Sequence, residues 1–131
     1  MPWTAILYPD RDAFTLRFVR AGEGISKFIG REATGIDYLD FVDPAIKGEA
    51  FDSTFVMLSR PCGLWQITPA LTADGRRIEV EYTGYPIFNR EEGQGQIIIL
   101  IEHSFSRVPL VVMVQHSTEW TWLEMRGPSI N

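Results

Sequence analysis

The stretch that decides the fold runs from residue 30 to residue 85. It begins with GREATGIDYLDFVDP (residues 30–44) and closes with the hairpin sequence TADGRRIEVEY (residues 72–82). Its order predicts two short helical turns, one longer capped helix, a strand, an Asp-Gly turn and a second strand. This order indicates an α+β domain in which helices pack on an antiparallel sheet.

The longer helix has a clear start and a clear end. Asp43 is suited to cap the helix with its carboxylate, and Pro44 suits the first helical position because its φ is already set. Pro61 and Gly63 then end the helix after about residue 59. One stripe of the helix, with two aromatic residues beside it, consists of Ile46, Ala50, Thr54, Leu58, Phe51 and Phe55. The pattern predicts an amphipathic helix.

Strand signals surround this helix. Residues 3–8 and 14–20 predict a hairpin with one buried face. Residues 64–71 and 78–82 alternate in the strand period on either side of Asp74-Gly75, so Glu79 and Glu81 are expected on a solvated face. Residues 97–101 are apolar at every position, which predicts a central strand covered on both faces.

Composition limits the class of protein. The chain has 131 residues, 14.9 kDa and 45% apolar side chains, which is enough for one core. Twelve basic and seventeen acidic side chains give a net charge of −5, which opposes a nucleic-acid partner. No apolar run reaches the roughly 18 to 20 residues that cross a bilayer, and the first residues lack a signal sequence, so we expect a cytoplasmic protein without a membrane partner.

The single cysteine, Cys62, permits no internal disulfide and no cysteine zinc cluster, and we expect an inert thiol in a loop.

Three pieces of sequence carry a resemblance to a known family. They are FVRAG (residues 18–22), FIGREATG (residues 28–35) and the Asp74-Gly75-Arg76 turn with the alternating strand after it. The chain resembles the PAS domain family over about residues 3–106, and its words are most similar to a small alphaproteobacterial PAS subfamily. The resemblance implies a five-stranded antiparallel sheet flanked on one face by short helices and one longer helix.

The resemblance divides the chain into a PAS-like domain, residues 1–108, and a C-terminal extension, residues 109–131. In the extension, the patterns for helix and strand are nearly tied over residues 118–126. We expect this segment to pack on the domain or to lie at a dimer interface. If it exposes Trp120 and Trp122, this aromatic pair would form a contact patch.

The resemblance implies that flavin or haem could be bound, and the residues of this chain argue against both cofactors. A flavin-linked PAS photoreceptor needs a cysteine where this chain has Ala33. A haem-binding PAS domain typically uses a histidine on the long helix, and residues 44–60 contain none. His103 and His116 are expected as satisfied or exposed side chains, and no metal site is expected.

Aromatic and apolar residues offer a pocket for some other small ligand. A cavity between helix and sheet is predicted to be lined by Phe51, Phe55, Met57, Trp65, Ile67 and Tyr82. The alternative is that these side chains simply fill the core.

Three functions remain open. The first is a non-enzymatic PAS-type sensory or regulatory module that forms a homodimer, acts on an unknown signalling protein and binds a small apolar ligand. The second is a small α+β enzyme of the ketosteroid-isomerase-like type, which would need a buried Asp, Glu or His facing the cavity; the sequence offers no convincing one. The third is a structural assembly unit that uses the Trp-rich tail.

Overall fold

A computed structural model describes residues 3–89, 94–102 and 111–124 of the chain. The elements in chain order are strands β1 (Thr4–Asp10) and β2 (Thr15–Ala21), helix α1 (Glu23–Ile29), 3₁₀ turns η1 (Tyr38–Phe41) and η2 (Pro44–Ile46), helix α2 (Lys47–Ser59), and strands β3 (Cys62–Thr72), β4 (Arg77–Asn89), β5 (Gln94–Glu102), β6 (Val111–Val114) and β7 (Glu119–Glu124).

The described strands form one antiparallel sheet in the order β2-β1-β5-β4-β3-β6, with β7 also paired to β3. The predicted count of five strands is too low, because the described part of the chain has seven. Strands β1 to β5 correspond to the five that were predicted. The two others come from the C-terminal segment and occupy the free edge of β3. Residues 119–124, where helix and strand were tied, form strand β7.

Strand β5 is central, as its apolar run predicts. It pairs with β1 on one side and with β4 on the other. His103 lies just beyond β5 and outside the described residues.

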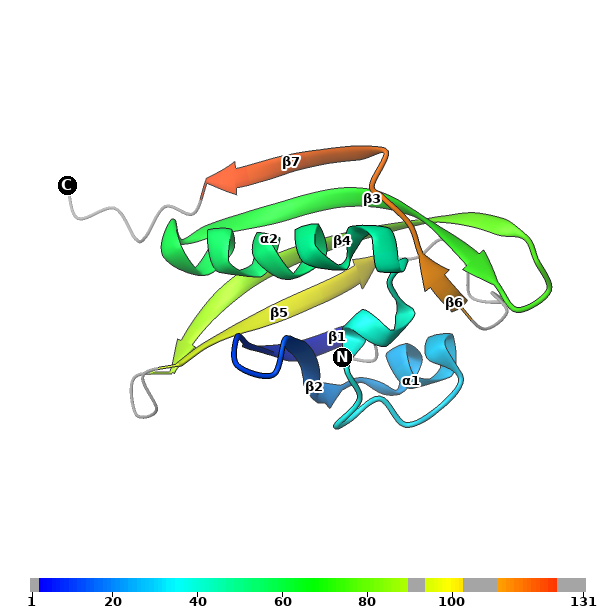
Figure 1. Ribbon diagram of the computed structural model, residues 1–131, viewed down its shortest axis with the longest axis horizontal. Coiled ribbons are helices and arrows are strands. Elements are labelled where there is room, and N and C mark those ends of the chain that lie inside the picture. Colours follow the sequence, from blue (N-terminus) through cyan, green and yellow to red (C-terminus); the bar gives the residue numbers. More distant parts are fainter. Residues whose placement is uncertain (1–2, 90–93, 103–110, 125–131) are drawn as a thin grey trace.

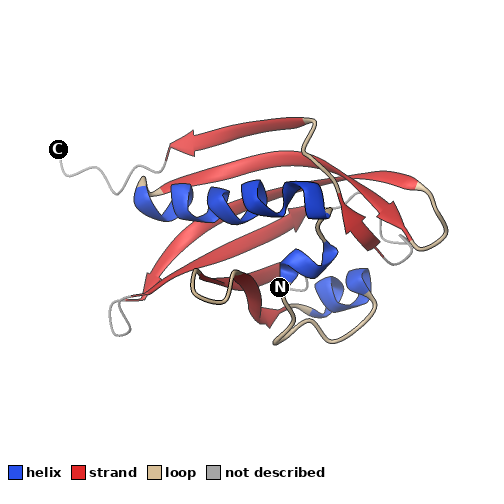
Figure 2. Cartoon of the chain, in the orientation of Figure 1, coloured by secondary structure: helices blue, strands red, loops and turns tan. Residues whose placement is uncertain are grey.

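The described helices and 3₁₀ turns lie over one face of the sheet (Figures 1 and 2). Capping carboxylates fix the two 3₁₀ turns in place. The carboxylate of Asp37 accepts hydrogen bonds from the backbone N–H of Leu39 at 3.0 Å and from that of Leu16 in β2 at 2.8 Å. Asp43 accepts from the N–H of Ala45 at 3.0 Å, which confirms the predicted helix start, although the first turn is 3₁₀ before α2 begins. Among the described helices none is long and apolar enough to span a membrane.

The hairpin of β3 and β4 sets which side chains face the helices. Gly75 in its turn has φ +83°, a left-handed conformation that glycine adopts without strain. Gln66 pairs with Tyr82, and Thr68 pairs with Val80. Val80 is buried and Glu79 is exposed, so the predicted alternation along β4 is confirmed.

The free edge of β3 is covered in two steps. Strand β6 pairs with residues 70–72, strand β7 pairs with residues 62–67, and the chain bulges away between them. Pro69 stands opposite the bulge. Its carbonyl accepts from the N–H of Gln115 at 2.9 Å, but proline has no N–H to return, so a continuous ladder cannot form at this point. The bulge places His116 and Ser117 beside the helix-facing side of the sheet.

Candidate ligand-binding cavity

A cavity of about 260 Å³ lies between α2, the helix-facing side of the sheet and the C-terminal segment. Its lining is mostly apolar, with a few polar groups. The lining residues are Leu7, Leu16, Tyr38, Val42, Ile46, Glu49, Ala50, Ser53, Thr54, Met57, Leu64, Gln66, Tyr82, Gly84, Val114, Gln115, His116, Ser117, Trp120 and Trp122. We call residues 114–122 the C-terminal strap, because they cross from β6 to β7 along one wall of the cavity.

A chain of uncharged polar groups crosses the sheet side of the cavity. The Ser117 hydroxyl donates to Oε1 of Gln66 at 2.8 Å and lies 2.8 Å from the Thr68 hydroxyl. The Thr68 hydroxyl is hydrogen-bonded to the Tyr82 hydroxyl at 3.3 Å, and the Tyr38 hydroxyl lies 3.5 Å from that of Tyr82. Through this chain the strap is joined to β3, β4 and η1.

The side chains of Tyr38 and Tyr82 stay uncharged over the physiological pH range. Burial raises the pKa of Tyr38 well above its ordinary value, and the neighbouring Tyr82 raises it further. Burial also raises the pKa of Tyr82, against hydrogen bonds from Thr68, Tyr38 and Gln66 that lower it. The two rings also line a second cavity of about 50 Å³ on the side of α1.

Helix α2 forms the opposite wall. Ala50 and Met57 contribute small or flexible apolar surface. The Ser53 hydroxyl donates to the carbonyl of Ala50 at 2.8 Å, and the Thr54 hydroxyl donates to that of Phe51 at 2.6 Å. The hydrogens of both hydroxyls are therefore committed to the helix backbone, whereas their oxygens can still accept.

Among the described lining residues, the charged side chains lie at the mouth of the cavity. The carboxylate of Glu49 on α2 lies 2.9 Å from Nε2 of His116 on the strap, and the two side chains are 71% and 62% exposed. The carbonyl of Ser117, which accepts from Nδ1, raises the pKa of His116, and Glu49 raises it further. The ion pair thus connects the strap to α2 across the mouth.

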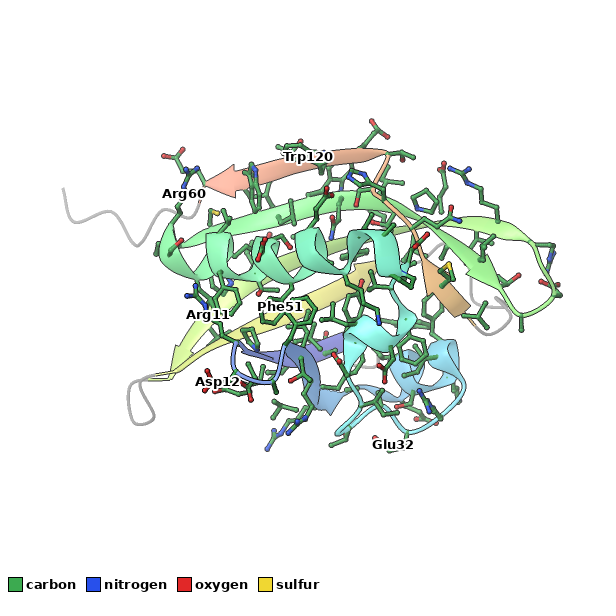
Figure 3. The ribbon with its side chains drawn as sticks, in the orientation of Figure 1. Arg11, Asp12, Glu32, Phe51, Arg60 and Trp120 are labelled. Atoms are coloured by element: carbon green, nitrogen blue, oxygen red, sulfur yellow. The ribbon has the colours of Figure 1, made fainter. Side chains whose placement is uncertain are left out.

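The structure brings four of the predicted functional residues to this cavity. Met57 and Tyr82 line it as predicted for a ligand pocket. Trp120 and Trp122, predicted for an interface, also line it, and their rings meet edge to face with centroids 6.1 Å apart. Because Trp120 is 54% exposed, this pair has one side in the cavity wall and the other in solvent. Figure 3 shows Trp120 on β7.

Phe51 and Phe55 lie elsewhere. Phe51 is 5% exposed and packs 4.7 Å from Phe14, while Phe55 carries the guanidinium of Arg11 at 4.0 Å from its ring centre. Figure 3 shows Phe51 and Arg11 on the side of α2 toward the β1–β2 turn. The prediction that these two rings line the cavity is corrected: Phe51 is part of the buried core, Phe55 packs against that core, and both border a separate groove beside that turn.

Trp65 and Ile67 also do not line the cavity. Gln66 is the cross-strand partner of Tyr82, so the neighbours of Gln66 in β3 point to the other face of the sheet. There Nε1 of Trp65 donates to the carboxylate of Glu81 at 2.7 Å. The sequence pattern placed Trp65 and Ile67 on the helix-facing side of β3, and the structure places the alternate residues, such as Gln66, on that side.

Sequence reasoning missed Gln66, Ser117 and Tyr38 as lining residues. Pro69, inside a predicted strand, was the available signal for Ser117, because proline within a sheet marks an edge or a bulge. Cys62 begins β3 instead of lying in a loop, and it is half-buried. Within residues 3–89, 94–102 and 111–124, no group of three or more His, Cys, Asp or Glu side chains is placed to hold a metal ion.

The fold is similar to that of a known domain. The structure superposes with a TM-score of 0.55 on the crystal structure of the PAS domain of a protein from Colwellia psychrerythraea, with 14% sequence identity over 80% of this chain and 89% of that chain. At this identity the similarity concerns the fold, and the chain has a PAS-like fold. A scan against models of protein families finds no match, and a search of curated proteins finds none.

Proposed function

We propose that this chain is a sensory or regulatory PAS-type module that binds a small ligand in the cavity and signals occupancy to a protein partner. The observation that carries the proposal is the cavity itself, about 260 Å³ with a mostly apolar lining and few polar groups. Small-molecule sites in proteins have this character. We also propose that the protein is cytoplasmic and that it belongs to the alphaproteobacterial PAS subfamily that its sequence resembles.

The C-terminal strap gives occupancy a route to the surface. Ser117 and Trp122 line the cavity, and Trp120 lines it while being 54% exposed. A ligand that displaces the strap would therefore also move exposed aromatic surface. Tryptophan is enriched where proteins meet, so we place the homodimer or partner contact of the module at this surface.

Binding without turnover fits the position of the carboxylates. Glu81 is bound to Trp65 on the far face of the sheet, and Glu49 is exposed at the mouth and paired with His116. A ketosteroid-isomerase-like reaction would need such a group at the centre of the pocket. We therefore propose a binding module and not an enzyme.

Native mass spectrometry of the protein as purified from cells tests the proposal. The native mass is compared with the denatured mass. Absorbance in the near-ultraviolet and visible is measured on the same protein to detect a chromophore. Ala50→Met would fill part of the cavity, and Ala45→Met makes the same change at an exposed alanine of η2 outside it. We expect an excess mass that denaturation removes, that Ala45→Met keeps and that Ala50→Met loses.

An identical clean mass for all three proteins would contradict ligand binding. A monomer at micromolar concentration that captures no partner would contradict the regulatory part. Circular dichroism of each variant confirms that a lost mass reflects the filled cavity and not unfolding.

A further inference from the structure

We propose that the ligand of this cavity is a small uncharged molecule with a compact apolar body, such as a single ring, and one hydroxyl group. The inference rests on the proposed ligand-binding function and adds the chemical class of the ligand. It follows from the size of the cavity, the location of charge and the hydrogen-bonding groups that are left free.

Size sets the first limit. The cavity measures about 260 Å³. A protein cavity of about 150 Å³ accepts benzene, with its six carbon atoms, so this one has room for about ten non-hydrogen atoms. Drug-sized ligands and large cofactors occupy pockets of roughly 300–1,000 Å³. The ligand is therefore a molecule with one ring or a short branched chain.

Charge sets the second limit. Within the described part of the chain, the only charged side chains that line the cavity are Glu49 and His116. They are 2.9 Å apart, largely exposed and already paired with each other. A charged ligand deeper in the cavity would find no counter-ion among the described lining residues, and burying an unpaired ion is costly. The ligand is therefore neutral.

Hydrogen bonding sets the third limit. The hydrogens of the Ser117, Ser53 and Thr54 hydroxyls are committed to protein acceptors, so their oxygens remain as acceptors. The Gln66 amide accepts from Ser117 through Oε1, and its –NH2 group supplies hydrogen-bond donors on the same side chain. A ligand hydroxyl can both donate to such oxygens and accept from such an N–H.

These limits also orient the ligand. Its hydroxyl belongs beside Gln66 and Ser117, where the strap meets β3. Its apolar body belongs against the remaining wall, which contains Leu7, Leu16 and Met57. Ser117 is then the residue of the strap that distinguishes a hydroxylated ligand from a purely apolar one.

The test uses three single-ring probes of similar size and different charge. They are 4-methylphenol, which is neutral, benzoate, which is an anion, and benzylamine, which is a cation at pH 7. Binding to the full 131-residue chain is measured by titration in two-dimensional NMR, with the shifted amides locating the site. We expect 4-methylphenol to bind at least tenfold more tightly than either charged probe, with shifts in α2, β3 and the strap.

A matched pair of variants tests the polar anchor. Ser117→Ala removes the hydroxyl beside Gln66, whereas Ser59→Ala removes an exposed one at the end of α2 that lies outside the cavity. We expect Ser117→Ala to weaken 4-methylphenol by about three- to tenfold, as the loss of one hydrogen bond predicts, and Ser59→Ala to leave it unchanged.

The other possible results of these titrations would overturn separate parts of the inference. If benzoate or benzylamine binds most tightly in the cavity, the neutral-ligand inference is overturned while the proposed ligand-binding function stands. If 4-methylphenol binds equally to the wild type and Ser117→Ala, the hydroxyl assignment is overturned. If no probe binds, the inference fails, and native mass spectrometry decides separately whether the ligand-binding function fails with it.

Discussion

The Tyr82 hydroxyl contacts two other hydroxyl groups at the floor of the cavity. The Thr68 hydroxyl donates to it at 3.3 Å, and the Tyr38 hydroxyl lies 3.5 Å from it. Tyr82→Phe leaves these partners short of one hydrogen bond in a part-buried site. We expect a loss of about 1–3 kcal/mol in the free energy of unfolding, measured by urea denaturation.

The double variant Tyr38→Phe/Tyr82→Phe separates hydrogen bonding from packing. Because it removes both hydroxyls of one pair, its cost should fall below the sum of the two single costs by about 0.5 kcal/mol or more. Tyr8→Phe, at a tyrosine of β1 outside this chain of groups, serves as the control. Strictly additive costs would show that the two hydroxyls do not interact.

At the scale of elements, the start of the long helical segment depends on one carboxylate. Asp43 accepts the N–H of Ala45 at 3.0 Å where the chain turns from η1 into η2 and α2. Asp43→Ala should lower the free energy of unfolding by about 1 kcal/mol, the usual cost of a lost N-cap. Asp40→Ala removes the same charge from an exposed position in η1 and should change stability by less than about 0.5 kcal/mol. Equal effects would assign the loss to charge.

Local signals in the sequence predict most of the elements but not how they pair. Caps, the Asp74-Gly75 turn and the central β5 are local or compositional signals, and they predicted the order of elements from β1 to β5 correctly. The face of β3 is not local, because Trp65 and Leu64 are both apolar and only the register with β4 places Leu64 toward α2. The pairing of the strap with β3 joins residues about fifty positions apart, which no local pattern specifies. The arrangement of β1 to β5 with the helices was therefore predictable, whereas the face of β3 and the strap, which line much of the cavity, were not.

At the scale of the whole molecule, the ion pair of His116 and Glu49 joins the strap to α2 across the cavity mouth. The pKa of His116 is raised in the folded state above its unfolded value of about 6.5. A raised pKa means that the folded protein holds this proton more tightly, so the contribution to stability is fully present below about pH 6.5 and is lost as the pH rises through the folded-state pKa. Because both side chains are mostly exposed, we expect no more than a few tenths of a kcal/mol.

The contribution of His116 is isolated by comparing the wild type with His116→Gln. Each protein is unfolded in urea at pH values below and above the titration of His116. The wild type should be the more stable of the two below about pH 6.5, and the difference should fall away as the pH rises through the folded-state pKa of His116. Glu49→Gln should remove the same pH-dependent difference, because either change leaves the strap without its charged contact to α2. A difference that stays constant with pH would mean that His116 holds the strap by packing alone, and the cavity mouth would then be insensitive to protonation.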